Sequence, residues 1–595
     1  MEDEALKYKS PSVAGKLQVR MDVFGLTPGT ASQLEAWLHA HDHRPYPAYH
    51  DIEGSWAFSG FTFFLDHAQA DPYALPSKAR VRVSHADAQF PPDMLVSSVR
   101  RTALADFLLR RIYEECMQRR YDVKLGGQGW AGGKGGQIQV DEPGQYVLER
   151  TAVVVDEHGI EVRFLVGLPA RGRSIMGAFA ASLLCEKVPR LVERGLYYTS
   201  YEPSALWAHI HGVEDQSALR EQLSSLGLVG FVRNGARLPR KRGDSDLPAD
   251  ECVAFTSPPS LQVSISVPHA GTIHGMGIRA GSLYVCVGGG FHGKSTFLSA
   301  MALGSYNFVP GDGREFVCTS PHVATVRSED GRAVHNVCID PFISNLPNGS
   351  DTQSFSTANA SGSTSCAAAL MEALELGADL LVLDEDTTAS NFLVRDALMQ
   401  ALVTSEPITP LVMHIRPLLA QTGVSVLLVS GASSAFLPVA DVVVQMDRYE
   451  MKDVTMHAKT LCEAQHVEPA PSSSKAVFAS LPTRTFSMPL SLDKSSTKHR
   501  HAIHVGQDVW DLHAIPQLVH PSQTRAIEAL ARRWSASTST TVSLRTLLDE
   551  VERELDTHGV DALMDRWPNG FYARPRRLDI GSALNRLRHI KFQST

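Results

Sequence analysis

The chain has 595 residues, 43% of them hydrophobic and 20% charged, a balance typical of a soluble globular protein with length for about three or four domains. No apolar run approaches the roughly 20 residues that a membrane-spanning helix needs, so we expect no membrane segment. A formal net charge of -8 argues against a surface that coats nucleic acid everywhere, although a local basic surface is compatible with it. The eight cysteines include no Cys-x-x-Cys pair, which favours a reducing compartment.

Residues 1–250 are predicted to form an α+β domain, because strand-like segments such as 146–155 occur beside helix-like ones such as 103–121. The glycine-rich stretch 126–136 surrounds Trp130 and Lys134. It lacks the hydroxyl residue after the lysine that would bind Mg²⁺ in a phosphate loop. We therefore expect a flexible hairpin between strands there.

A complete G-x-x-x-x-G-K-S pattern begins at Gly288, between an apolar strand at 283–287 and a helix-compatible run at 297–301. Glycines let the main chain wrap a triphosphate, the lysine spans two phosphates and the following hydroxyl binds Mg²⁺. The pattern therefore predicts ATP and Mg²⁺ as ligands. The expected nucleotide contacts are Gly288, Gly290, Gly293, Lys294, Ser295 and Thr296, with Lys294 also catalytic and Ser295 also a metal ligand.

The next motifs lie within 251–449, which we predict to be a nucleotide-binding domain with a mostly parallel sheet. A Ser-Gly turn at 361–363 opens a clear helix, and it resembles the signature loop of ABC-class ATPases, which offers a helix N-terminus to a γ-phosphate. We therefore expect Ser361, Gly362 and Ser363 to contact nucleotide. An ordinary serine helix cap is the alternative interpretation.

An apolar strand at 379–383 ends in two carboxylates. Beside a phosphate loop, Asp384 is expected to hold Mg²⁺ through water and Glu385 to polarise the attacking water. Both this strand and the one before the phosphate loop would end in the crevice where open parallel sheets bind ligands.

Two departures from the ABC-class pattern follow from the same comparison. Transporter-type members carry a histidine after the next strand, but here the strand at 424–429 runs into Ser430 and Gly431. His414 precedes that strand and is interpreted as an unrelated histidine. The usual glutamine between the phosphate loop and the signature is also unclear, since the segment 334–339 is followed by Asp340 and Gln353 is a weaker candidate. The absent histidine predicts slow turnover.

Residues 450–595 are predicted to hold a linker and a mostly helical C-terminal region. The stretch 469–475 is rich in proline and serine. Ser522 is expected to cap one helix. A second helix carries a leucine and valine stripe, which is more typical of core than of a partner site, and ends at Gly559. Its stripe consists of Leu544, Leu547, Leu548, Val551 and Leu555.

From about residue 49 to residue 588 the chain resembles a family described as predicted ATPases of the ABC class. The resemblance rests on the order of short motifs, among them 71–74, 143–145, 166–173, 310–315, 359–365 and 521–526. Within that family the chain is most similar to a kinetoplastid mitochondrial RNA-binding ATPase associated with RNA editing. The resemblance implies an α/β fold with an ABC-type P-loop core, a homodimer that closes on two ATP molecules, RNA and RNA-editing proteins as partners, and a mitochondrial location. The acidic start of the chain shows no targeting segment, so without the resemblance the expected location is cytoplasmic.

Basic residues gather near 163–173, 233–242 and 574–577. Arginine forks suit phosphates, although each cluster alone is equally typical of a solvated face. Few aromatic residues lie nearby to stack on bases, so contacts to the RNA backbone would dominate. The residues expected to contact RNA are Arg163, Arg171, Arg173, Arg237, Arg240, Lys241 and Arg242.

Two hypotheses of function stay open. In the first, the protein binds or remodels RNA with ATP-driven dimer closure. In the second, it is a slow nucleotide-gated scaffold for a protein complex and does not bind RNA directly. A transporter motor is disfavoured, because nothing in the large N-terminal region couples to a membrane span.

Overall fold

The computed structural model describes residues 28–125, 133–470, 478, 483–487, 492, 494–536, 542–564, 566–588 and 590–594. They form two compact units. Unit 1 comprises the described parts of 1–143, 149–210 and 553–574, and unit 2 comprises those of 144–148, 211–552 and 575–595. The predicted domain borders at 250 and 450 stay predictions, and most of the predicted hairpin, at 126–132, lies outside the described residues.

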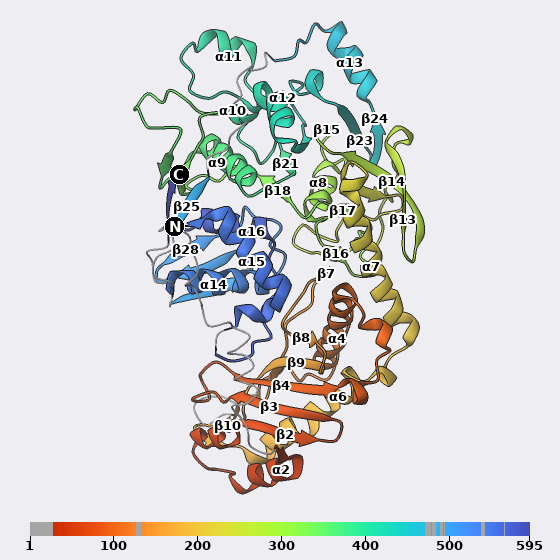
Figure 1. The fold of residues 1–595 in the computed structure, drawn as a ribbon, viewed down its shortest axis with the longest axis vertical. Coiled ribbons are helices and arrows are strands. Elements are labelled where there is room, and N and C mark those ends of the chain that lie inside the picture. The colour runs from red at the N-terminus through yellow and green to blue at the C-terminus, as the bar shows by residue number, and fades with distance from the viewer. Residues whose placement is uncertain are drawn as a thin grey trace, which may run out of the picture. The chain divides into compact units, whose positions relative to one another are not determined.

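Unit 1 is built on a seven-stranded sheet in the order β1-β2-β3-β4-β9-β6, with β8 also paired to β9. All pairs are antiparallel except β1 with β2, and β2, β3, β4 and β9 run side by side in Figure 1. Strand β4 alternates buried and half-buried residues along its length, which is the pattern of a sheet with one face on a core. The strands are β1 (Gly29–Thr30), β2 (Gly54–Phe58), β3 (Phe61–His67), β4 (Ser77–Ser84), β6 (Ile138–Gln139), β8 (Val153–Val155) and β9 (Gly159–Val166).

Helices and a small second sheet complete unit 1. Helix α4 packs against β8 and α6, and α2 begins with a capping box between Thr30 and Gln33. The second sheet has the order β11-β10-β5. The elements are α2 (Ala31–Ala40), α3 (His85–Ala88), α4 (Ser98–Gln118), α5 (Gly177–Ala181), α6 (Val188–Gly195), β5 (Gly133–Lys134), β10 (Ala170–Arg171) and β11 (Ser174–Ile175). Helix α7 (Pro203–Ser225) begins here and continues into unit 2.

Unit 2 centres on a six-stranded sheet in the order β18-β21-β22-β15-β23-β24. The first five strands are parallel and β24 is antiparallel to its neighbour. Every residue of β22 is buried, as expected of a parallel strand covered on both faces. The strands are β15 (Leu283–Gly288), β18 (Val323–Val326), β21 (Leu380–Asp384), β22 (Ser425–Val429), β23 (Val442–Asp447) and β24 (Glu450–Asp453).

Helices that pack on this sheet and three further sets of paired strands complete the P-loop core. Helix α8 packs on β15, β22, β21 and β18. A four-stranded antiparallel sheet has the order β13-β14-β12-β17, and β16 pairs with β7 and β19 with β20. These elements are α8 (Lys294–Leu303), α9 (Gly362–Glu375), α10 (Ser390–Leu393), α11 (Ala397–Leu402), α12 (Leu411–Thr422), α13 (Thr455–Ala464), β7 (Tyr146–Val147), β12 (Leu228–Arg233), β13 (Gln262–Val267), β14 (Gly271–Arg279), β16 (Asn307–Phe308), β17 (Val317–Thr319), β19 (Val334–Val337) and β20 (Phe355–Thr357).

The C-terminal part adds strands to the predicted helices. Two three-stranded sheets have the orders β29-β25-β30 and β26-β27-β28. The predicted leucine and valine stripe of α15 is buried, and the helix ends just before Gly559 as expected. Ser522 lies inside the first turn of α14 and not before it. The elements are β25 (Arg484–Ser487), β26 (Ser495–His499), β27 (Ala502–Val505), β28 (Asp508–Asp511), α14 (Pro521–Ala536), β29 (Val542–Ser543), α15 (Leu544–His558), α16 (Arg577–Asn585) and β30 (Lys591–Ser594). None of the helices found among the described residues is both long and apolar enough to span a membrane.

Candidate nucleotide site

The predicted phosphate loop joins β15 to α8. Gly288 ends the strand with φ 144°, and a Cβ there would lie 2.3 Å from the carbonyl oxygen of Met446, so only glycine fits. Gly293 precedes the helix with φ 100°. A Cβ on Gly290 would contact nothing within 4 Å. The loop therefore has a main-chain shape that two of its three predicted glycines make possible.

The next three side chains lie at the N-terminus of α8. Lys294 Nζ donates to the carbonyl oxygens of Gly288 at 2.9 Å and Gly289 at 2.8 Å. Ser295 is exposed and Thr296 is half-buried. Because a helix N-terminus carries unpaired N–H groups and the positive end of the helix dipole, it attracts phosphate. The loop, Lys294 and the N-terminus of α8 thus supply the kind of donors that bind an anion.

The two predicted carboxylates lie at the same edge of the sheet. Asp384 is the last residue of β21, and the Glu385 N–H donates to the carbonyl oxygen of Val429 at 3.0 Å. The Ser430 N–H donates in turn to the carbonyl oxygen of Cys286 in β15 at 3.0 Å. The ends of β21, β22 and β15 are therefore level, which brings the carboxylates to the phosphate-loop edge.

The donors at this edge suit Mg²⁺. A serine hydroxyl and a carboxylate are hard oxygen donors, and protein sites for Mg²⁺ commonly supply one or two of them while water and phosphate oxygens complete the shell. Ser295 and Asp384 are such a pair. The described residues contain no group of three or more His, Cys, Asp or Glu side chains that could hold a metal by itself. The pair therefore fits an ion that arrives with a nucleotide.

Glu385 is held by the loop after β22. Its Oε2 accepts hydrogen bonds from the Gly431 N–H at 2.6 Å and the Ala432 N–H at 3.0 Å. The Ser430 hydroxyl lies 3.0 Å from the same oxygen and 2.8 Å from the carbonyl oxygen of Ser433, and its one proton is shared between these two acceptors. Burial alone would raise the pKa of Glu385, but the N–H groups of Ala432 and Gly431 and the hydroxyl outweigh it and lower the pKa. All three donors bind one oxygen. We call this arrangement the Glu385 clamp.

The clamp occupies the position where the sequence comparison expected a histidine. Strand β22 runs directly into Ser430, as predicted. His414 lies in α12, is 4% exposed and packs edge-on against the rings of Phe342 and Phe478. Burial lowers the pKa of His414. It is therefore a core histidine.

The predicted signature forms the start of α9. Ser361 is exposed before the helix, and its hydroxyl pairs with that of Thr364 at 3.0 Å. A Cβ on Gly362 would lie 2.5 Å from Ser328 Oγ, so a larger residue there would require this serine side chain to move. Ser363 is buried. No hydrogen bond or ion pair between described residues joins this turn to the phosphate loop of the same chain.

The strand that precedes the signature in the core sheet differs from the one predicted. The sequence favoured 334–339, followed by Asp340, but β19 in that segment pairs with β20 outside the core sheet. The core strand next to β21 is β18, and Arg327 follows it. Asp340 accepts a hydrogen bond from Thr352 and Gln353 from Cys338. The predicted assignment was therefore wrong, because strand pairing and not local apolarity selects the core strand.

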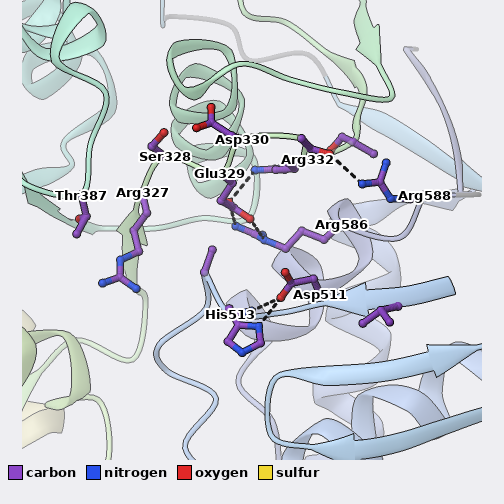
Figure 2. Close-up of a pocket in the computed structure, with 14 residues that line it drawn as sticks. Arg327, Ser328, Glu329, Asp330, Arg332, Thr387, Asp511, His513, Arg586 and Arg588 are labelled. Carbon is purple, nitrogen blue, oxygen red and sulfur yellow. Dashed lines mark hydrogen bonds and ion pairs between the residues drawn. The ribbon is translucent and has the colours of Figure 1, made fainter. Parts of the chain in front are cut away.

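A pocket of about 510 Å³ opens beside this segment. Figure 2 shows that residues after β18 form one side and C-terminal residues the other. Arg586 binds Glu329 with Nε–Oε2 and Nη2–Oε1 distances of 2.9 Å and 2.5 Å. Asp511 accepts from His513 at 2.6 Å. No sequence pattern indicates this pocket, because its two sides lie about two hundred residues apart in the chain.

The basic residues of unit 1 differ in availability. Arg163 is 6% exposed and binds Asp561 at 2.6 Å and 2.7 Å and Glu161 at 2.7 Å. Burial works to lower the pKa of Arg163, but the two carboxylates outweigh it and raise the pKa. Arg171 and Arg173, in contrast, are exposed on the β10–β11 hairpin. Two of the three predicted RNA contacts in this unit therefore have accessible guanidinium groups.

Most basic side chains of the 233–242 cluster, in unit 2, already bind carboxylates or main-chain carbonyls of the same chain. Arg240 is half-buried and donates to Asp312 and to main-chain carbonyls. Arg237 donates to a main-chain carbonyl at 3.0 Å. Lys241 and Arg242 are exposed, and each lies within about 3 Å of a carboxylate. The third cluster, 574–577, is ion-paired throughout.

Comparison with known families agrees with this geometry. Residues 202–481, which hold the phosphate loop, the signature and both carboxylates, match the family model described as the P-loop domain of ABC ATPases. Residues 202–481 therefore form a P-loop domain of the ABC-ATPase class. Residues 31–199 match the model described as the N-terminal domain of ATPases of the ABC class. Residues 494–593 match the model described as the MRB1590 C-terminal domain.

Relatives and solved structures are more distant. Over 248 residues the chain is 26% identical to the uncharacterized protein MJ1628 of Methanocaldococcus jannaschii. The matched stretch covers 40% of this chain and 54% of that protein. The chain thus spans about half the length of this relative. Two solved structures share 12% identity: cbiO1 from Clostridium perfringens, part of the cbiONQ transporter complex, and MJ1267, an ATP-binding cassette of an ABC transporter. They cover 41% and 40% of this chain and 96% of their own, with TM-scores of 0.25 and 0.24.

Proposed function

We propose that this ATPase binds two ATP molecules in a homodimer and uses their hydrolysis to bind or remodel RNA. The observation that carries the ATP part is the common edge at which the phosphate loop, Asp384 and Glu385 meet. In ABC-class ATPases the signature of one subunit completes the nucleotide site of the other. The exposed Ser361 at the start of α9 fits that role, since nothing in its own chain ties it to the phosphate loop.

The RNA part is supported by the β10–β11 hairpin. Its short sheet places Arg171 and Arg173 around Gly172, whose φ of 58° allows a tight turn. Neither guanidinium has an ion pair or hydrogen bond among the described residues. Arg44 is also exposed and adjoins the hairpin, since its carbonyl oxygen accepts from the Ile175 N–H at 2.8 Å. Free arginine forks beside one another fit the phosphates of RNA.

Location and partners follow from the C-terminal match. The MRB1590-type domain supports a role in mitochondrial RNA editing or processing, with proteins of an editing complex as partners. Hydrolysis is slow in this proposal, because the Glu385 clamp replaces the histidine of transporter-type ATPases.

The dimer is tested with a Glu385→Gln variant, which retains the shape of the side chain but not its basicity. With ATP and Mg²⁺ it is expected to elute from a sizing column as a dimer and, since a general base contributes about 10²- to 10⁴-fold, to lose most of its phosphate release. A variant that stays monomeric with ATP would contradict the proposal.

RNA binding is tested by measuring affinity for a single-stranded RNA over a salt series. Each phosphate contact contributes about -0.7 to the log-log slope, so Arg171→Ala/Arg173→Ala is expected to flatten the slope by about 1.4. The matched control is Arg111→Ala/Arg119→Ala, which removes two exposed arginines that pair with helix carboxylates in the same unit. Equal slopes for parent and hairpin variant would remove the hairpin from the RNA surface.

The second candidate function is a nucleotide-gated scaffold without direct RNA binding. The Glu385 clamp favours it as well, since slow hydrolysis suits a timer for assembly. RNA-stimulated hydrolysis by the parent protein would exclude the scaffold, whereas absence of RNA binding at low salt would leave it as the function.

A further inference from the structure

Arg327 stands at the carboxyl end of β18, one strand away from the carboxylates. The register pairs Val326 with Leu383, so the next residues, Arg327 and Asp384, are level on neighbouring strands. Such strands lie about 4.8 Å apart. The arginine therefore begins at the same edge of the sheet as the phosphate loop and the metal-binding carboxylate.

The face of the sheet is set by alternation along β18. Side chains two residues apart point to the same face, so Val323, Thr325 and Arg327 share one. Val323 packs in the same core as Phe297 and Met301 of α8, and Thr325 is bound by Gln517, whose amide also donates to the carbonyl oxygen of Ala302 in α8. Arg327 thus follows the face of the sheet that the phosphate-loop helix covers.

The guanidinium of Arg327 has no hydrogen bond or ion pair among the described residues, although its neighbours are satisfied. Arg332 and Arg586 bind Glu329 or Glu372, and Arg588 donates to two main-chain carbonyls. Figure 2 shows Arg327 directed away from the Glu329–Arg586 pair. A half-buried arginine that has no partner among the described residues is available to an anionic ligand.

We propose that Arg327 binds the terminal phosphate of the ATP held by the phosphate loop. The inference rests on the proposed ATP site. A guanidinium fork is suited to two phosphate oxygens at once, and it stabilises the negative charge that the transition state spreads over the equatorial oxygens of the transferred phosphoryl group. Arg327 would therefore recognise ATP over ADP and stabilise hydrolysis from within its own chain.

The segment that follows Arg327 is bonded to the signature turn and to the C-terminal part, so a movement of Arg327 would reach both. The Ser328 N–H donates to the carbonyl oxygen of Thr387 at 2.9 Å, and the Gly331 N–H to that of Ala360, just before the signature, at 2.8 Å. The Glu329–Arg586 pair continues the connection to residues after α16. If a bound phosphate moved Arg327, these hydrogen bonds would also move the signature turn, which in the proposed dimer contacts the partner subunit.

The experiment compares two nucleotides on four proteins. Mg²⁺ complexes of ADP and of the non-hydrolysable β,γ-imido analogue of ATP are titrated into the parent, Arg327→Ala, Arg327→Lys and the control Arg416→Ala by calorimetry. Arg416 is an exposed arginine of the same unit that pairs with Asp441. Thermal unfolding of each variant verifies that it is folded.

The expected result is that Arg327→Ala weakens the ATP analogue about 10- to 100-fold, the range for a hydrogen bond between charged groups, and leaves ADP unchanged. Arg327→Lys restores part of the loss, and Arg416→Ala changes neither affinity. Equal affinities in parent and Arg327→Ala, or equal losses for both nucleotides, would overturn the inference alone. A parent that binds neither nucleotide would overturn the ATP site and this inference with it.

Discussion

The Glu385 clamp predicts that Ser430→Ala accelerates ATP hydrolysis. The three donors bind only Oε2 and hold the carboxylate against the loop after β22, so the prediction assumes that the side chain turns out of the clamp before Oε1 or Oε2 accepts a proton from water. Removing the hydroxyl deletes one of three donors, which lie at 3.0 Å, 2.6 Å and 3.0 Å. Because Glu385 is partly exposed and solvent screens its charge, we discount the usual range for a hydrogen bond to a charged group to about 1 kcal/mol.

That energy fixes two measurable changes. A loss of about 1 kcal/mol raises the released fraction of Glu385, and so kcat at neutral pH, about fivefold. It also raises the pKa of the carboxyl, because the deleted hydroxyl stabilises the charged form. The clamp lowers this pKa, so the parent keeps its base ionised at lower pH, and in Ser430→Ala the acid limb of the rate profile moves to higher pH.

The assay is phosphate release at saturating ATP between about pH 4 and 8. Ser433→Ala is the control, because that hydroxyl lies in the same loop but accepts from the Ala435 N–H and does not touch Glu385. If kcat falls in Ser430→Ala and stays constant in Ser433→Ala, the clamp orients the base instead of restraining it, and the reasoning is wrong.

Two further predictions concern the framework of the site. Gly288→Ala is expected to abolish ATP binding and to cost about 1–3 kcal/mol of stability, since its Cβ would overlap a main-chain oxygen of β23, whereas Gly290→Ala leaves the melting temperature unchanged; equal melting temperatures would refute this. Arg484→Ala is expected to cost about 3–5 kcal/mol in denaturant unfolding, because it leaves the buried carboxylate of Glu375 unpaired, while the exposed Arg500→Ala costs little; similar losses would contradict it.

Elements with long, regular apolar patterns were predictable from the sequence. The apolar run before Asp384 and the one before Gly288 form β21 and β15 as expected, since an unbroken apolar run between turn residues is typical of a buried parallel strand. The helix after the signature and the leucine stripe of α15 are confirmed for the same reason. In each case the decisive information lies within one segment.

Features that depend on distant partners were not predictable. Strands β18 and β19 are both short and apolar, and only their pairing decides which one borders β21. Arg163 lies in a basic cluster, but its guanidinium is bound by Asp561, which follows 398 positions later in the chain. The Glu385 clamp is formed largely by main-chain N–H groups, whose direction depends on loop geometry and not on residue type.

The interleaving of the two units constrains how the chain can fold during synthesis. Unit 1 includes 553–574, so its last segment leaves the ribosome after almost all of unit 2. Until then the buried guanidinium of Arg163 lacks the carboxylate of Asp561. Domains normally fold in order from the N-terminus as they emerge, but here unit 1 is complete only once 553–574 has been synthesised, after most of unit 2. An N-terminal fragment that stops before residue 553 would bury Arg163 without the carboxylate of Asp561. We therefore expect proteases to degrade such a fragment.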